Sequence, residues 1–236
     1  MSYLSLAHRV PEASAVEPKA LVHLYTVITL APLVRTVYRR FVSGALAQGV
    51  DEGWCLDLGT GPGTVAIHLA RRSPGLHMVG LDLSLAMVQQ ARRKADRAGL
   101  NGRGGWPQAD AHKLPFADGQ FDLVFSSFAM HHWGDPLQIL NEAARVLKPG
   151  GRYHLTDLCR QTNLVQRAFA YASIPVISLP YGSYRGYGGY YESVRSAYTR
   201  DEARDLLERS NLPPGEVTLD STWFIPILAI ASRGEG

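Results

Sequence analysis

A short stretch near residue 60 places three glycines between a strand-like run and a helical one. It reads Cys55-Leu-Asp-Leu-Gly-Thr-Gly-Pro-Gly-Thr64, and a second strand-like run, Gly80-Leu-Asp-Leu-Ser84, follows downstream. Because glycine lacks a Cβ, the turn can adopt positive φ and a ligand can approach the bare backbone. The helix N-terminus that follows attracts anionic groups, and Asp82 at the second strand end can accept hydrogen bonds from a ribose. The pattern predicts a nucleoside-binding site in an α/β fold.

Short apolar runs alternate with amphipathic segments through the middle of the chain. Strands are predicted at 54–58, 78–81, 121–127 and 152–157, with a weak one near 106–108, and helices at 63–72, 85–98 and 136–147. Such alternation predicts parallel strands joined by right-handed helical crossovers. Ligands of such sheets bind beyond the carboxyl ends of the strands.

The two ends of the chain depart from this alternation. Residues 1–50 are predicted to form an N-terminal helical cover, with two helices that break near Pro32. The tail holds two strand-like runs, 217–224 and 227–232, which are so close in sequence that they are expected to pair antiparallel. Residues 159–200 are rich in tyrosine and glycine, and a connection of this length favours a lid or binding insertion.

Composition excludes several classes of protein. The chain has 236 residues and a formal net charge of +3, which fits one domain with a modest insertion and does not indicate a nucleic-acid partner. Two cysteines, Cys55 and Cys159, are too few for a disulfide framework and wrongly spaced for zinc. No signal-peptide pattern is present, and the apolar run at 24–34 is too short for a membrane span. We therefore expect a cytoplasmic protein without bound metal.

Two kinds of nucleoside ligand compete for the glycine turn. Gly61, Gly63 and Ala66 fit the loose dinucleotide fingerprint, with Asp82 placed for a ribose, which would indicate a nicotinamide-dependent oxidoreductase. However, Asp57 stands ahead of the glycines, where it would repel a pyrophosphate but suit the ammonium group of an amino acid. The glycines are also more tightly spaced than in a dinucleotide turn, and the C-terminal hairpin is not expected of a plain dinucleotide-binding half.

Several motifs occur together and in a fixed order between residues 54 and 157. They are Asp57-x-Gly-x-Gly-x-Gly63, Asp82, Gln108-Ala-Asp-Ala-His-Lys-Leu-Pro-Phe116, Phe121-Asp-Leu-Val124, Met130-His-His-Trp133 and Glu142-Ala-Ala-Arg-Val-Leu-Lys-Pro-Gly-Gly-Arg152. As a set they resemble class I S-adenosylmethionine-dependent methyltransferases of the small-molecule type, similar to quinone and sterol methyltransferase domains. The resemblance implies a doubly wound, seven-stranded, mostly parallel sheet with an antiparallel C-terminal hairpin. It places the cofactor-binding core at 51–158, completed by the helix and hairpin of 201–236.

The resemblance implies a role for each residue of the glycine turn. Gly59, Gly61 and Gly63 would lie under the amino-acid part of S-adenosylmethionine, with Asp57 near its ammonium. Asp82 would hold the ribose hydroxyls.

Further cofactor contacts are implied for residues of the neighbouring strand ends. Leu83 would pack on the adenine face, Asp110 would accept from the adenine amino group, and the Ala111 N–H would lie nearby. The backbone at Ser126 and Ser127 would line the methionine side. Alternatives stay open, because Asp110 could cap a loop and Leu83 could be ordinary core.

The histidines at the end of the 121–127 strand are candidates for catalysis. A general base is needed only when the acceptor keeps its proton at neutral pH, and histidine titrates in that range. His131 is the candidate base or acceptor contact, and His132 a candidate acceptor contact or a loop residue packed beside Trp133. Asp157 could touch the acceptor or serve as a cap.

Tyrosines are the candidate walls of an acceptor pocket, because their faces are apolar and their tips polar. We expect three tyrosines to contact the acceptor: Tyr184, Tyr187 and, near the N-terminus, Tyr25. The first two lie in a segment that also holds Tyr181, Tyr190 and Tyr191. A flexible surface loop is the alternative for the first group.

The absence of two known motifs narrows the range of possible acceptor classes. Ser126-Ser-Phe-Ala129 replaces the Asn/Asp-Pro-Pro-Tyr that methylation of adenine or glutamine nitrogen would need, and arsenic methylation would need more thiolates. A small or medium organic acceptor, methylated on O, N or C, remains. A nicotinamide oxidoreductase and a non-catalytic S-adenosylmethionine-binding module are the alternatives, and the oligomeric state is left open.

Overall fold

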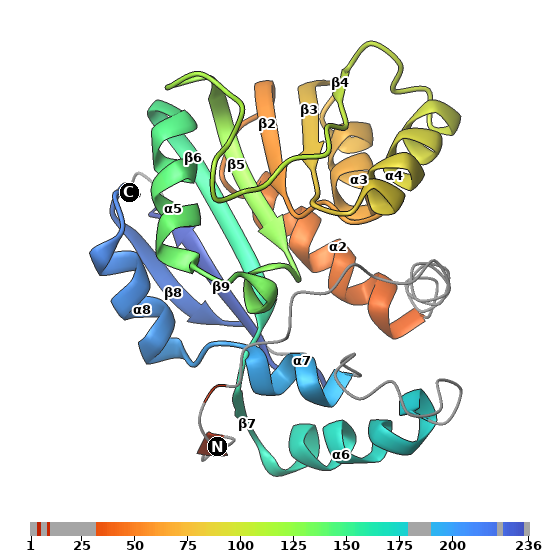
Figure 1. Cartoon of the computed structure of the whole chain (residues 1–236), viewed down its shortest axis with the longest axis vertical. Coiled ribbons are helices and arrows are strands. Elements are labelled where there is room, and N and C mark those ends of the chain that lie inside the picture. The colour runs from red at the N-terminus through yellow and green to blue at the C-terminus, as the bar shows by residue number, and fades with distance from the viewer. Residues whose placement is uncertain (1–3, 6–8, 10–31, 179–189, 221–223, 234–236) are drawn as a thin grey trace.

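A central β-sheet organises the chain, as seen in a computed structural model that describes residues 4–5, 9, 32–178, 190–220 and 224–233 (Figure 1). The strands of this sheet are β2 (Glu52–Leu58), β3 (Gly75–Leu81), β4 (Gly104–Gly105), β5 (Phe121–Ser127), β6 (Leu147–Leu158), β8 (Gly215–Leu219) and β9 (Ile227–Ser232). Their order is β4-β3-β2-β5-β6-β9-β8. Strands β2 to β6 are parallel, and β9 runs antiparallel to both β6 and β8. The predicted fold class is confirmed.

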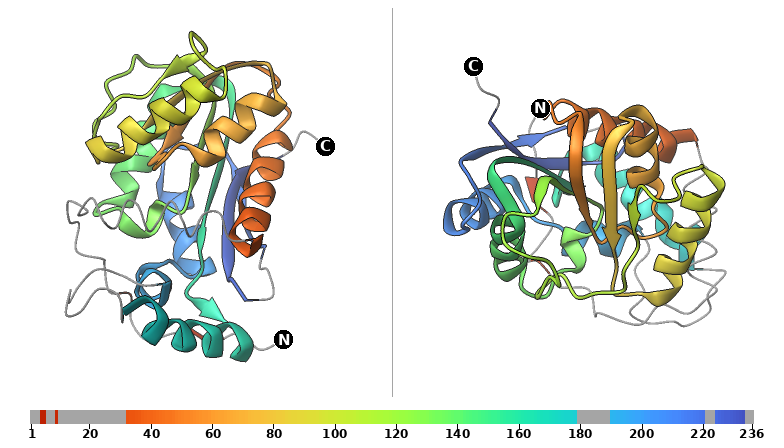
Figure 2. Two further views of the ribbon diagram at one scale, coloured as in Figure 1. Left: turned by 90° about the vertical axis from the view of Figure 1, so that its right-hand side faces the viewer. Right: turned by 90° about the horizontal axis from the view of Figure 1, so that it is seen from above.

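Helices cover both faces of the sheet, because alternate strand residues point to opposite sides. Leu56 and Leu58 pack into one cluster with α5 (Pro136–Val146) and α8 (Arg200–Arg209). Cys55, which precedes Leu56 and points to the opposite face, packs into the other cluster with α2 (Pro32–Leu46) and α3 (Thr64–Arg72). Helix α4 (Leu85–Arg97) lies beside α3 (Figure 2). As expected of a small buried hydrophobe, Cys55 is fully buried, and burial raises the pKa of its thiol to about 12.

Most predicted strands and helices are found in the structure, with several differences in their bounds. Strand β3 begins at Gly75 and β6 at Leu147, earlier than the predicted 78 and 152. The strand predicted near 106–108 is instead β4 at 104–105, although Gln108 still forms an isolated bridge with Asp82. The strand predicted at 217–224 ends at Leu219, because Asp220 N already closes the hairpin on Ile227 O. Of the two predicted N-terminal helices, the second is α2, which begins at Pro32, and the first lies outside the described residues.

The remaining elements gather below the carboxyl ends of the strands. A short helical turn, η1 (Met130–His132), follows β5, while α6 (Leu164–Ser178) and α7 (Tyr190–Ser196) follow β6 (Figure 1). Two short strands, β1 (Leu4–Ser5) and β7 (Gln161–Thr162), pair antiparallel. Among the helices that the structure describes, none is long and apolar enough to cross a membrane.

Candidate active site

The glycine turn lies where β2 meets α3 and is anchored to the end of β3. Gly59, Gly61 and Gly63 have φ values of 71°, 53° and 74°, which side chains with a Cβ rarely adopt. Thr60 N donates to Leu81 O at 2.8 Å, and Gly61 N donates to Asp82 Oδ2 at 2.9 Å. A Cβ at Gly61 would meet nothing within 4 Å, so this backbone faces open space. The turn therefore presents bare backbone beside the Asp82 carboxylate.

Asp57 brings an unsatisfied carboxylate oxygen to the same turn. Its side chain is 1% exposed, and Oδ2 accepts a 2.8 Å hydrogen bond from Thr60 Oγ1. Oδ1 is buried and has no hydrogen-bond partner among the described residues. Burial raises the pKa of this carboxyl to about 7, against the opposing effect of the Thr60 hydroxyl. An ammonium group is the chemistry that would satisfy Oδ1 and restore its charge.

Asp82 and Leu83 form the next part of the site at the end of β3. Asp82 Oδ1 accepts from Ser84 N at 2.8 Å, and burial raises the pKa of Asp82 although the N–H groups of Ser84 and Gly61 oppose it. Each carboxylate oxygen still has lone pairs for a diol. Leu83 is 65% exposed, which excludes an ordinary core role and fits a flat apolar ligand. Gln108 Nε2 donates to Leu83 O at 3.0 Å and so fixes its backbone.

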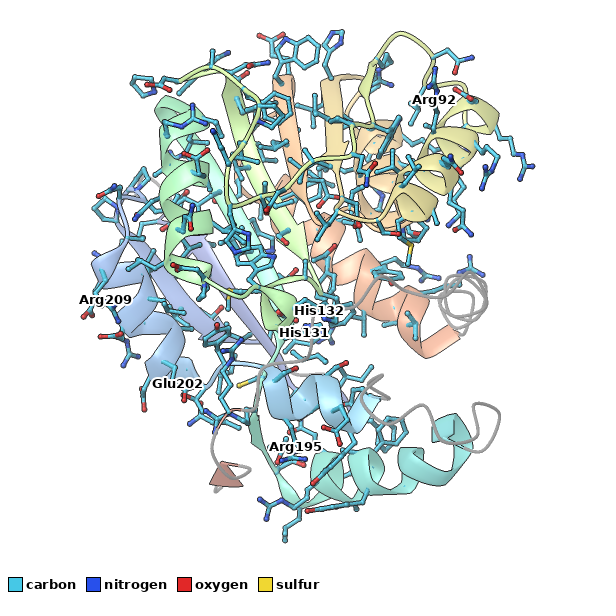
Figure 3. The ribbon with its side chains drawn as sticks, in the orientation of Figure 1. Arg92, His131, His132, Arg195, Glu202 and Arg209 are labelled. Atoms are coloured by element: carbon cyan, nitrogen blue, oxygen red, sulfur yellow. The ribbon has the colours of Figure 1, made fainter. Side chains whose placement is uncertain are left out.

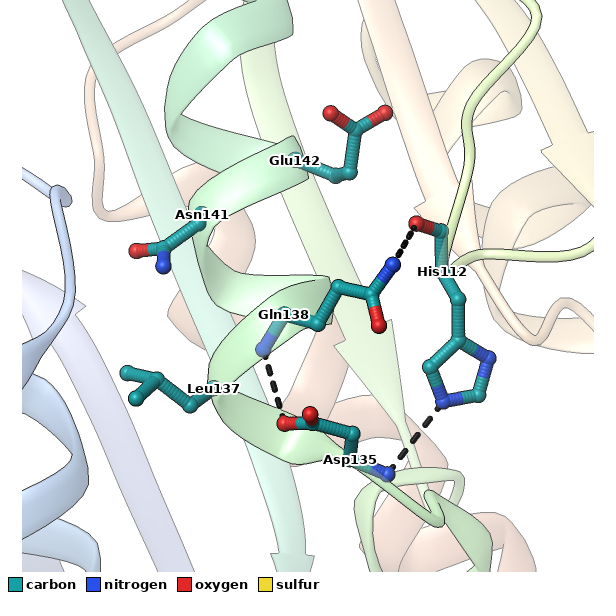
Figure 4. Close-up of a pocket in the computed structure, with 6 residues that line it drawn as sticks. All are labelled: His112, Asp135, Leu137, Gln138, Asn141 and Glu142. Carbon is teal, nitrogen blue, oxygen red and sulfur yellow. Dashed lines mark hydrogen bonds between the residues drawn. The ribbon is translucent and has the colours of Figure 1, made fainter.

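Asp110 follows on the outer side, held by His112. Oδ1 of Asp110 accepts from both the backbone N (2.9 Å) and Nδ1 (2.7 Å) of His112, and these bonds lower the pKa of Asp110. The carboxyl is half exposed, and the neighbouring Ala111 is half-buried. His112 also borders a polar hollow of about 340 Å³ along α5, where its Nε2 accepts from Asp135 N at 3.2 Å (Figure 4).

Ser126 and Ser127 end β5 beside the turn. Ser126 Oγ donates to Leu58 O at 2.6 Å, and Thr156 Oγ1 donates to Ser126 O at 3.1 Å. These bonds tie the end of β5 to β2 on one side and β6 on the other. The predicted cofactor residues thus lie together along one edge of the sheet, in an arrangement that fits an amino acid, a ribose and an adenine in sequence.

Phe128 turns the chain from β5 toward η1 in a strained conformation. Its φ is 54°, which is uncommon for an aromatic residue and concentrates at functional sites. Phe128 N donates to Thr156 O at 3.0 Å, and its ring packs edge-on against Phe41 and Tyr38 of α2, with centroid distances of 4.7 and 6.1 Å. Phe128 was not among the predicted site residues, because φ is not visible in a residue pattern.

His131 and Asp157 form a buried pair at the ends of β5 and β6. His131 Nδ1 lies 2.7 Å from Asp157 Oδ1, and His131 N donates to Asp157 Oδ2 at 2.6 Å. The two side chains are 4% and 2% exposed. Leu158 N adds a third bond to the carboxylate at 2.7 Å. Asp157 therefore caps η1, one of the two roles expected from the sequence, and also orients the His131 ring. Its contact with the acceptor stays a prediction.

His132 lies over His131, with 3.9 Å between ring centroids, and its side chain is exposed (Figure 3). Trp133, the next residue, is buried in the core. Tyr25, Tyr184 and Tyr187 lie outside the described residues, so their proposed contacts with the acceptor stay predictions.

Trp106, which was not among the predicted site residues, borders the glycine turn. The Trp106 ring lies so close that a Cβ at Gly80 would approach it to 2.6 Å and a Cβ at Gly63 to 3.2 Å. The missing side chains at these glycines are what admit the ring. Its place at the start of the predicted weak strand was visible in the sequence, but its packing against the two glycines was not.

Comparison with known proteins gives one consistent result. A family model described as a methyltransferase domain matches residues 56–155. The demethylmenaquinone methyltransferase of Thermus thermophilus is 39% identical over 155 residues, covering 62% of this chain and 69% of the relative. The ubiquinone/menaquinone biosynthesis C-methyltransferase UbiE of Cereibacter sphaeroides is 31% identical over 183 residues, covering 72% and 73%.

Solved structures share the fold. A chain from Methanococcus maripaludis aligns with a TM-score of 0.67 at 22% identity, covering 95% of this chain and 98% of that one. A SAM-dependent methyltransferase from Aquifex aeolicus aligns with a TM-score of 0.58 at 21% identity, covering 78% and 84%. At these identities the likeness concerns the fold alone.

Proposed function

Because this chain belongs to the class I S-adenosylmethionine-dependent methyltransferases, we propose that its acceptor is a hydroquinone-type aromatic ring that it methylates on carbon. Methyltransferase activity and S-adenosylmethionine as methyl donor follow from the family, which removes the oxidoreductase alternative. The acceptor is suggested by the names of the two relatives above, both of which refer to quinones. The observation that carries the proposal on this chain is the buried His131–Asp157 pair.

The donor-binding residues are proposed as follows. Asp57 Oδ1 would receive the ammonium of the amino-acid part, and the Gly59–Gly63 turn would lie under that part. Asp82 would hold the ribose, Leu83 and Ala111 would flank the adenine, and Asp110 would accept from its amino group. The backbone at 126–127 would line the methionine chain. When bound, S-adenosylmethionine supplies an activated methyl group on a sulfonium.

The His131–Asp157 geometry defines which ring nitrogen can act as a base. A carboxylate only accepts hydrogen bonds, so the 2.7 Å contact assigns the ring hydrogen to Nδ1. In the neutral ring, Nε2 is then the nitrogen that accepts a proton. Asp157 stabilises the imidazolium that forms and fixes the ring orientation, which is the arrangement of a positioned general base.

A hydroquinone ring needs such a base. Its hydroxyl groups keep their protons at neutral pH, since an unperturbed phenol has a pKa of about 10. His131 Nε2 takes one hydroxyl proton, and the oxygen electron pair moves into the ring. When bound, S-adenosylmethionine would supply the methyl group to the neighbouring ring carbon and leave as S-adenosylhomocysteine. Water would take the proton that this carbon loses as the ring becomes aromatic again.

The test uses 1,4-naphthohydroquinone under anaerobic conditions, with methyl-labelled S-adenosylmethionine and mass spectrometry of the product. We expect label on a ring carbon. His131→Gln should lower kcat by about 10²- to 10⁴-fold, with the dissociation constant for S-adenosylmethionine unchanged. The matched control is His77→Gln, which should keep wild-type kcat. The centroid of the His77 ring lies 4.9 Å from that of Trp54. Label on oxygen or unchanged kcat in His131→Gln would refute the proposal.

A further inference from the structure

Tyr198 lies at the edge of the sheet where the acceptor is proposed to bind. It connects α7 to α8 and forms an isolated parallel bridge with Cys159 at the end of β6. Arg160 N donates to Tyr198 O at 3.1 Å, and the next residue, Thr199, begins α8 with a capping box. Two residues before Cys159 stands Asp157, the partner of His131. The backbone at Tyr198 is therefore fixed close to the proposed general base.

The Tyr198 hydroxyl is buried and unsatisfied. The residue is 5% exposed, and Oη has no hydrogen-bond partner within the described part of the chain. Buried hydroxyl groups nearly always have a partner, so an exception needs an explanation. Phenylalanine would fill the same space without this cost. A bound group that supplies the missing partner is one explanation.

Arg9 brings a second unsatisfied donor to the same place. Its guanidinium carbon lies 4.2 Å from the centroid of the Tyr198 ring, and its Nε donates to Ser196 O at 2.8 Å. Arg9 Nη2 is buried and, like Tyr198 Oη, lacks a partner among the residues that the structure describes. A guanidinium has donors and no acceptor, so the pair is suited to an oxygen that carries negative charge.

The charges around Tyr198 keep its hydroxyl a donor. Burial raises the pKa of Tyr198 to about 12, opposed by Arg9 and assisted by the carboxylates of Asp157, Glu202 and Asp135. At neutral pH the hydroxyl therefore keeps its proton. Glu202 is itself paired with Arg160, which leaves the positive charge of Arg9 available to a ligand.

We propose that Tyr198 Oη and Arg9 Nη2 bind the second ring oxygen of the acceptor, the one that His131 does not deprotonate. This inference rests on the proposed function. A 1,4-dihydroxy ring has oxygens at opposite ends, so one end can face His131 while the other reaches the Arg9–Tyr198 pair. The Tyr198 hydroxyl and the Arg9 guanidinium are both donors, so they can hydrogen-bond to the lone pairs of this oxygen and hold the ring with its other hydroxyl toward His131. The pair would distinguish hydroquinones from simple phenols.

The test compares two probes, 1,4-naphthohydroquinone and 1-naphthol, which lacks the second oxygen. For wild-type protein we expect kcat/KM at least tenfold higher for the hydroquinone. Tyr198→Phe should lower kcat/KM for the hydroquinone about tenfold, leave 1-naphthol unchanged, and keep or raise the melting temperature. Arg9→Gln should likewise lower kcat/KM for the hydroquinone. A structural role for the hydroxyl would instead lower the melting temperature and affect both probes equally.

A binding measurement separates failure of this inference from failure of the proposed function. Calorimetry with the S-adenosylhomocysteine complex should show tighter binding of the hydroquinone than of 1-naphthol in wild type, and a smaller difference between the two probes in Tyr198→Phe. If the protein binds the hydroquinone more tightly than 1-naphthol but does not methylate it, the proposed reaction is wrong and the proposed oxygen-binding site at Tyr198 and Arg9 is supported. Equal binding of both probes to wild-type protein would overturn the subsite, and a water at Tyr198 Oη would then account for its burial.

Discussion

Asp57 Oδ2 accepts a hydrogen bond from Thr60 Oγ1, while Asp57 Oδ1 remains buried without a partner in the described residues. Since burial raises the pKa of this carboxyl to about 7, it is protonated in the free protein at mildly acidic pH. Binding the ammonium of S-adenosylmethionine would require its ionised form. The affinity for the cofactor should therefore rise with pH up to about 7, by at most about tenfold per pH unit, and level off above.

The measurement is calorimetric titration with S-adenosylmethionine from pH 5.5 to 8.5, in buffers of different ionisation enthalpy. At pH 6 binding should release about one proton from Asp57. The Asp57→Asn variant should bind S-adenosylmethionine more weakly than wild type at pH 8, and its affinity should rise little with pH. The same slope in Asp57→Asn would show that another group is responsible.

The same carboxyl should lower the stability of the free protein at neutral pH. Its folded pKa lies above the unfolded value of 3.8, so its contribution to stability is complete below that value and is lost as pH rises through about 7. Asp57→Asn removes the charge and should raise the free energy of unfolding at pH 8 by about 1–3 kcal/mol. Urea denaturation at pH 4.5 and pH 8 should show a smaller gain at pH 4.5. A gain independent of pH would contradict the assignment.

His112 should control cofactor affinity through Asp110. It supplies two hydrogen bonds to Asp110 Oδ1 and links that loop to Asp135 at the start of α5. His112→Ala keeps the backbone bond but loses the ring, so the carboxylate should become less well oriented. We expect S-adenosylmethionine to bind about 2- to 10-fold more weakly. Lys113→Ala, a change at the next position, is the control, and equal effects of the two variants would reject a specific role for the ring.

The parts of the fold with long, regular patterns could be predicted from the sequence. The limits of β5 and β9 agree with the structure because their apolar runs are bounded by polar or turn-forming residues. The glycine turn was predictable because its φ values demand glycine. The two-residue strands β1 and β7 were not, since each depends on a partner more than 150 residues away in sequence.

The candidate site was predictable as a set of residues but not as contacts. His131 and Asp157 were both singled out, yet their pairing depends on the register of β5 with β6, in which Ser127 lies opposite Thr156. It depends also on the strained turn at Phe128. Arg9 and Tyr198 meet only in the folded chain, so no spacing in the sequence indicates them.

His154 on β6 should make the protein sensitive to acid. Both ring nitrogens are buried with no partner in the described structure, and burial lowers the pKa of His154 from 6.5 to about 4, against the opposing effect of Asp220. Its contribution to stability is present above pH 6.5 and is lost as pH falls toward 4, in total about 3 kcal/mol. His154→Leu should therefore be more stable than wild type, by a margin that grows between pH 7 and pH 5. Urea denaturation at the two values measures it, and a constant margin would refute the protonation argument.

Gly44 on α2 and His154 should be strongly coupled. A Cβ at Gly44 would approach His154 Nε2 to 2.3 Å, so Gly44→Ala should cost about 1–3 kcal/mol, although alanine normally favours a helix interior by about 0.5–1 kcal/mol. In a His154→Ala background the ring is gone, and the same change should become stabilising. Urea denaturation of the four proteins in this cycle gives the coupling energy, which we expect to be about 2 kcal/mol or more. Additive effects would mean that α2 does not press on β6 at this point.

The same change should also lower methyltransferase activity, because Phe41 and Tyr38 of α2 pack on Phe128 and a shift of the helix in Gly44→Ala would disturb that contact. His154→Ala should restore part of the activity.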